Sequence, residues 1–126
     1  MLEHLKLTRV GPAPVMELEL APRLNFFTGD NGLGKSFLLD IAWWSLTRTW
    51  ARSMAVPQRP FKGGVKPTIQ FRYGGITAPY EYVSTFNRQE QSWPVKQGRP
   101  PIPGLVIYAQ LDGGFSAWDP ARNYWK

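Results

Sequence analysis

The sequence predicts a mixed α/β fold built around one strand–loop–helix unit, with antiparallel β hairpins beside it. Three observations predict this arrangement. Short segments alternate apolar with polar residues, which is typical of strands buried on one face. One longer segment repeats apolar residues at helical spacing. Twelve glycines and twelve prolines among 126 residues separate these segments, and such a composition favours many short elements over a helical bundle.

Three strands are predicted before the helix. Residues 5–8 and residues 16–20 alternate apolar with polar side chains, and the second of these segments has an acidic outer face. The turn Gly11-Pro12-Ala13-Pro14 separates them. The third segment, residues 24–28, is short and mostly apolar, so we expect a central strand that is buried on both faces.

The helix is predicted over residues 35–50. Leu39, Trp43, Leu46 and Trp50 recur at helical spacing, and further apolar residues between them indicate that the first turns are buried nearly all round. Pro57 prevents the helix from continuing far beyond this segment.

The second half of the chain is predicted to be antiparallel β structure. Residues 68–86 have the alternation and central Gly-Gly turn of a hairpin, whereas the polar, proline-rich residues 87–103 indicate a long connection. Residues 105–109 form the last strong strand, which a turn at Asp112-Gly113-Gly114 directs toward residues 115–118. We expect residues 1–126 to be part of one domain, divided into 1–52 (strands, loop and helix) and 53–126 (antiparallel β region).

Composition excludes several classes of function. The chain has no cysteine, so disulfides and thiolate metal sites are excluded. It has neither a signal peptide pattern nor an apolar stretch of the roughly 20 residues that a membrane span needs, and we expect a cytoplasmic protein. The net charge of +6 suits an anionic partner. The basic residues are scattered without any block, among them Arg59, Lys66 and Arg88, which argues against a nucleic-acid patch within this chain.

Residues 29–36 are the strongest functional motif. They are Gly29, Asp30, Asn31, Gly32, Leu33, Gly34, Lys35 and Ser36, which satisfy the phosphate-loop pattern GxxxxGK[ST]. Glycines allow successive backbone N–H groups to surround a phosphate, and the start of a helix adds partial positive charge. Lys35 supplies a full charge to the β- and γ-phosphates, and the Ser36 hydroxyl is a ligand for Mg²⁺. The motif predicts binding of a purine nucleotide, most simply ATP, with Mg²⁺.

The segments 5–11 and 26–36 together resemble the N-terminus of the ABC-type ATPases of the SMC/Rad50/RecF group. The particular feature is Asn31 followed by Gly32 in a loop of the form G-x-N-G-x-G-K-[ST]. The rest of the chain is similar to prokaryotic "AAA family ATPase" sequences, some of them associated with anti-phage defence. The resemblance implies a partial P-loop NTPase lobe, ATP hydrolysis by the full-length protein, nucleotide sandwiched between two heads in a dimer, and possible action on DNA through the full assembly.

The resemblance also implies two further site residues. Gln110, after the strand at 105–109, would be a residue that approaches Mg²⁺, although a turn-forming role of the neighbouring Asp112-Gly113-Gly114 is the more favoured interpretation of this segment. Arg9, at the end of the first strand, would approach the nucleotide from the side, although an exposed arginine at a strand end is the favoured alternative. The sequence contains neither the family's Walker B strand nor its signature helix. Its switch histidine is also missing, because the only histidine is His4, which we interpret as a surface residue. We therefore expect a truncated lobe that is inactive alone.

Two alternatives remain open from the sequence. A small P-loop kinase would transfer phosphate to a metabolite, although 126 residues leave little room for its lid and second substrate site. A basic nucleic-acid-binding module would stack bases on the hairpin aromatics Phe71, Tyr73, Tyr80 and Tyr82. The phosphate loop would have no role in that module.

Overall fold

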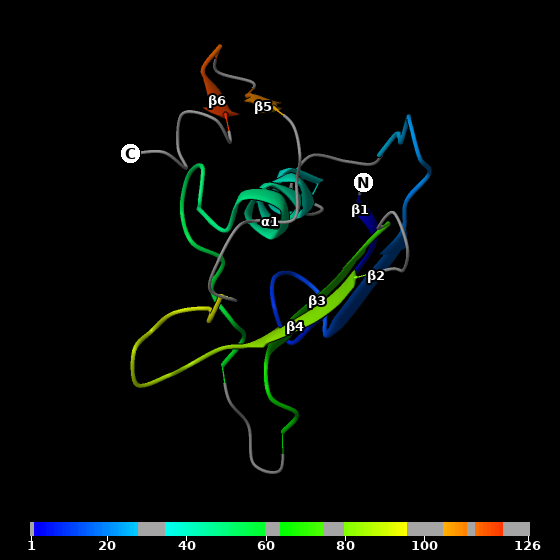
Figure 1. The fold of residues 1–126 in the computed structure, drawn as a ribbon. Coiled ribbons are helices and arrows are strands. Elements are labelled where there is room, and N and C mark those ends of the chain that lie inside the picture. Colours follow the sequence, from blue (N-terminus) through cyan, green and yellow to red (C-terminus); the bar gives the residue numbers. More distant parts are fainter. Residues whose placement is uncertain are drawn as a thin grey trace.

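The computed structural model describes residues 2–27, 35–59, 64–74, 80–95, 105–110 and 113–119. Within these ranges the fold is mixed α/β, with six strands, mostly antiparallel hairpins, and one helix (Figure 1). The described residues contain no helix that is long and apolar enough to cross a membrane.

The main sheet has four strands in the order β2-β1-β3-β4, and every neighbouring pair is antiparallel. The strands are β1 (Leu2–Thr8), β2 (Val15–Glu19), β3 (Thr68–Tyr73) and β4 (Tyr80–Thr85). The predicted strands at 5–8 and 16–20 and the predicted hairpin at 68–86 are therefore confirmed. The two hairpins are joined by the pairing of β1 with β3, which sets Leu5 opposite Phe71 and Leu7 opposite Ile69.

The core lies between one face of this sheet and the helix α1 (Lys35–Thr47) (Figure 1). Leu5, Leu7 and Ile69 on the sheet are fully buried, as is Ile41 on the helix. Trp44 of α1 meets Phe71 edge to face, with their ring centroids 5.7 Å apart. Apolar burial of this kind, rather than intrinsic helix propensity, stabilises a helix of 13 residues.

The helix runs antiparallel to β1. Near its C-terminal end, the carbonyl of Ser45 accepts a hydrogen bond from the hydroxyl of Tyr73, which is paired with Leu2 at the start of β1. Near its N-terminal end, the ring of Phe37 lies against Gly11, just beyond the end of β1. The N-terminus of α1 is therefore at the end of the sheet where β1 finishes.

The predicted helix at 35–50 is confirmed, but it ends three residues earlier, at Thr47. Arg48 takes up the left-handed conformation with φ 59°, and its N–H donates to the carbonyl of Trp44 at 2.7 Å. A left-handed residue in this position is a common helix terminator. Trp50 then folds back and stacks on Trp44, with ring centroids 5.3 Å apart. Its helical spacing therefore correctly indicated that the side chain packs against the core, although Trp50 itself is not helical.

The prediction of a central strand at 24–28 is wrong for the residues that the structure describes. Residues 24–27 belong to no strand, and Leu24 and Phe26 are 67% and 82% exposed. A short apolar segment becomes a strand only where a neighbouring strand pairs with its backbone. In the described part of the chain, β2 is an edge strand of the main sheet, and no further strand pairs with it. Thr28, the last residue of the predicted strand, lies outside the described residues.

A second sheet consists of β5 (Val106–Ala109) and β6 (Phe115–Trp118), which form an antiparallel hairpin as the sequence predicts. Figure 1 shows this hairpin beyond α1, away from the main sheet. Tyr108 of β5 faces the helix, where its ring centroid is 6.3 Å from that of Trp43. On the other face of the hairpin, Ile107 and Phe115 are 62% and 72% exposed, so apolar surface remains uncovered there.

Candidate functional site

Lys35 and Ser36, the last two residues of the phosphate-loop motif, are the first two residues of α1. Lys35 is half-buried and Ser36 is exposed. The first turn of α1 contains no acidic residue, so its unpaired N–H groups and the positive end of the helix dipole face no competing carboxylate from their own turn. The other predicted residues of the loop, Gly29, Asp30, Asn31, Gly32, Leu33 and Gly34, lie outside the described residues.

The first turn of α1 is fixed against the turn between β1 and β2. Gly11 has a φ of 78°, and a Cβ atom built on it would lie only 2.4 Å from Cε1 of Phe37. Glycine is therefore required here twice over, for its left-handed conformation and for the close approach of the ring. This contact brings the turn that contains Arg9 and Gly11 near the helix start that contains Lys35.

Arg9 itself is held in a strained turn. It has a φ of 57°, which is uncommon for a residue other than glycine. Its N–H donates to the carbonyl of Pro14, and its carbonyl accepts from the N–H of Gln58, both at 2.8 Å. The side-chain amide of Gln58 also donates to the carbonyls of Gly11 and Ala13, each at 3.0 Å. These bonds hold the turn after β1 against the connection that follows α1.

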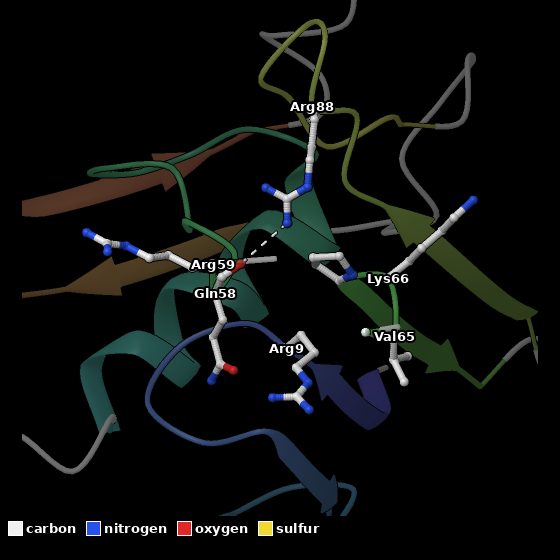
Figure 2. A pocket seen from close by; sticks show the side chains of 8 residues that line it. Arg9, Gln58, Arg59, Val65, Lys66 and Arg88 are labelled. Carbon is white, nitrogen blue, oxygen red and sulfur yellow. Dashed lines mark hydrogen bonds between the residues drawn. The ribbon is translucent and has the colours of Figure 1, made fainter. Parts of the chain in front are cut away.

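The side chain of Arg9 lines a small basic pocket at this end of the sheet. The cavity measures about 110 Å³. Its lining residues come from the turn after β1, the connection after α1, the segment before β3 and the turn after β4, and they are Arg9, Gln58, Arg59, Gly64, Val65, Lys66, Pro67 and Arg88 (Figure 2). Four of these eight residues are cationic and none is acidic, so the pocket favours an anion.

Sequence reasoning did not find this pocket, because its cations are far apart in the chain. Arg59, Lys66 and Arg88 were among the basic residues interpreted as scattered. A usable signal was present, since Arg9 follows one predicted strand, Lys66 precedes another and Arg88 follows a third. The sheet order turns these positions into neighbours.

Gln110 lies at the end of β5 and closes the turn to β6. Its N–H donates to the carbonyl of Gly114 at 2.8 Å, its carbonyl accepts from the N–H of Gly113 at 3.2 Å, and its side-chain amide donates to Oγ of Ser116 at 3.4 Å. These bonds agree with the turn-forming alternative for this segment. That Gln110 approaches Mg²⁺ stays a prediction.

His4 is not the surface residue that we expected. It is only 6% exposed, and its Nε2 atom lies 2.8 Å from a carboxylate oxygen of Glu17 and 3.7 Å from one of Glu19. This hydrogen bond holds the pKa of the Glu17 carboxyl below its ordinary value of 4.5. Alternation places His4 on the outer face of β1 with Lys6, but it does not predict the burial of His4 there, which comes from contacts with Glu17 and Glu19 of β2.

The His4, Glu17 and Glu19 side chains could together offer ligands to a metal ion, since their ligand atoms lie within 4.8 Å of one another. However, the guanidinium of Arg72 is also part of this cluster, 3.2 Å from Glu19. A cation already bonded to one of the carboxylates opposes the binding of another. The cluster therefore fits a set of cross-strand ion pairs that stabilises the outer face of the sheet.

The aromatic residues of β3 and β4 do not form an exposed stacking platform. Phe71 and Tyr73 are each 4% exposed, and Tyr80 and Tyr82 are half-buried against the same core. Burial raises the pKa of the Tyr73 hydroxyl well above its ordinary value. Bases cannot stack on Phe71 and Tyr73, because both side chains are buried, whereas a role of the half-buried Tyr80 and Tyr82 in nucleic-acid binding stays a prediction.

We compared the chain with protein-family models, with curated proteins and with solved structures, and found no match in any of the three.

Proposed function

We propose that this chain binds Mg²⁺–ATP through residues 29–36 and is the N-terminal segment of an ABC-type ATPase. One observation carries the proposal. The GxxxxGK[ST] motif runs directly into α1, so that Lys35 and Ser36 occupy its first turn. A phosphate loop needs this arrangement, because the helix N-terminus and the lysine act on the same phosphates.

The surroundings of the helix start support the proposal. The first turn lacks acidic residues, and its third residue, Phe37, is held against the backbone of Gly11. A rigid first turn keeps its N–H groups directed at one place, which lowers the entropy that a bound phosphate must remove. Ser36 is exposed, so its hydroxyl is accessible to a metal ion that bridges two phosphates.

The proposed role is binding, with hydrolysis dependent on sequence and partners beyond this chain. The sequence offers no Walker B carboxylate and no signature helix, and a water molecule needs such a carboxylate to be positioned for attack. In the proposed assembly, the rest of the ATPase or a second head in a dimer completes the site. Action on DNA and a cytoplasmic location belong to the same proposal.

Calorimetric titration with ATP tests the proposal, with Mg²⁺ and with a chelator. Ser36→Ala removes a metal ligand and no phosphate contact. We expect it to weaken binding when Mg²⁺ is present and to leave the affinity in chelator unchanged. Thr8→Ala on β1 is a matched control, because it also removes one hydroxyl. A loss of affinity in chelator as large as that in Mg²⁺ would show that Ser36 does not act through the metal.

A parallel assay addresses the kinase alternative. Incubation of the chain with Mg²⁺–ATP and a panel of small phosphate acceptors should give no phosphorylated product. Transfer to any of them would replace the ATPase proposal with a kinase.

A further inference from the structure

The basic pocket gathers cations from four separate parts of the chain. Thr8 at the end of β1 is paired with Thr68 at the start of β3, and Thr68 is paired with Thr85 at the end of β4. The residues that flank these positions, Arg9, Lys66 and Arg88, therefore lie at one end of the sheet. Arg59 joins them through the connection after α1, which the bridge between Val10 and Pro57 attaches to the turn after β1.

The backbone around the pocket is well fixed. Pro67 is buried, and its carbonyl accepts from the N–H of Phe86 at 3.1 Å. The turn that carries Arg88 is closed by the bridge between Asn87 and Ser92 and by the Asn87 side chain, which accepts from two following N–H groups. These contacts hold the segments that carry Lys66 and Arg88, so the meeting of these two residues at one end of the sheet is a property of the fold.

Among the described residues, three of these four cations, Arg59, Lys66 and Arg88, lack an acidic partner. No acidic side chain is among the described residues that line the pocket. The guanidinium of Arg88 makes one long hydrogen bond, 3.4 Å, to the carbonyl of Gln58. Figure 2 shows Arg9 and Arg88 on opposite sides of the cavity, with Arg59 and Lys66 extending outward from its rim.

We propose that this pocket binds a single phosphate group, as free phosphate or as the terminal phosphate of a small phosphomonoester. Guanidinium groups present planar, forked donors that match phosphate oxygens. The cavity of about 110 Å³ suits one such group, because sites for whole drug-sized ligands measure roughly 300–1,000 Å³. The proposal is separate from the phosphate loop, since Lys35 does not line this cavity.

The test is a titration of the chain with inorganic phosphate, followed by two-dimensional NMR at constant ionic strength. Backbone amide signals of residues 58–59, 64–66 and 88 should shift and saturate, whereas sodium chloride at matched ionic strength should leave them in place. Arg88→Gln and Lys66→Gln should each weaken phosphate binding about fivefold, and the double variant more. Arg23→Gln removes the same charge from an exposed position outside the pocket and should leave the affinity unchanged.

Phenyl phosphate in place of phosphate distinguishes the two sources. Tighter binding of the ester identifies a phosphomonoester as the ligand, and tighter binding of free phosphate identifies the ion itself. Three results would overturn the proposal: no saturable shift, an equal loss of affinity in Arg23→Gln, or loss of phosphate binding in Lys35→Ala. The last would assign the anion to the phosphate loop. ATP affinity provides an independent readout, because Arg88→Gln should weaken phosphate binding and leave ATP binding unchanged. If residues 29–36 bind no nucleotide, the phosphate titration still tests the pocket.

Discussion

Replacing Gly11 with alanine tests how firmly the β1–β2 turn is seated on the first turn of α1. A Cβ atom at this position would lie 2.4 Å from Cε1 and 2.7 Å from Cζ of Phe37, and the φ of 78° disfavours alanine. The left-handed conformation costs about 1 kcal/mol, and displacement of a packed ring costs about 1–3 kcal/mol more. We therefore expect Gly11→Ala to lower the free energy of unfolding by about 2–4 kcal/mol.

Urea denaturation followed by far-ultraviolet circular dichroism measures this loss. Gly113→Ala is the matched control, because Gly113 has a φ of 87° but nothing lies within 4 Å of an added Cβ. It should lose only the conformational part, about 1 kcal/mol. In a Phe37→Leu background, Gly11→Ala should likewise cost only about 1 kcal/mol, since the ring is gone. Equal losses at the two glycines, or strict additivity of Gly11→Ala with Phe37→Leu, would refute the reasoning.

Three other outcomes follow from the structure. Trp93→Phe should lower the free energy of unfolding by about 2–4 kcal/mol in urea denaturation, because it removes a buried donor 2.9 Å from the carbonyl of Ala55; an unchanged unfolding midpoint would contradict this. NMR titration should find the pKa of Glu17 below 4.5 and should find it returned toward 4.5 in His4→Ala. Because the folded pKa is depressed, the stability that Glu17 contributes is present above its unfolded pKa and is lost as the pH falls through the folded value; a His4→Ala variant with an unaltered Glu17 titration would contradict this assignment. Sedimentation velocity should show self-association through exposed apolar surface, and Phe115→Ser should reduce it; a monodisperse parent chain would refute that expectation.

The hairpins and the helix could be predicted because their signals are local. Alternation over 5–8 and 68–86 and helical spacing over 35–50 identify elements whose hydrogen-bond partners lie close along the chain. The hairpin at 105–118 follows from the same signals. These elements are confirmed, with the helix end corrected from Trp50 to Thr47.

Features that depend on distant partners could not be predicted. The apolar residues 24–27 satisfy the local pattern of a strand, but no described strand pairs with them. The pairing of β1 with β3 has no local signal, yet it creates the basic pocket by making neighbours of Arg9 and Lys66. The burial of His4 depends on two carboxylates of the neighbouring strand β2. In each case the deciding contact joins residues that are separated in the sequence.

The dissociation constant of ATP in the presence of Mg²⁺, measured on the parent chain and on Lys35→Ala, tests the central claim most directly. In the proposed site, the substitution removes the side-chain charge that would act on the β- and γ-phosphates and leaves the glycines of the loop intact. A charge-assisted contact of this kind contributes about 1.5–3 kcal/mol, so the affinity should fall about tenfold to a hundredfold. Lys6→Ala, on the outer face of β1, removes an equal charge and should leave the affinity unchanged. If Lys35→Ala binds ATP as tightly as the parent chain, residues 29–36 are not a nucleotide site.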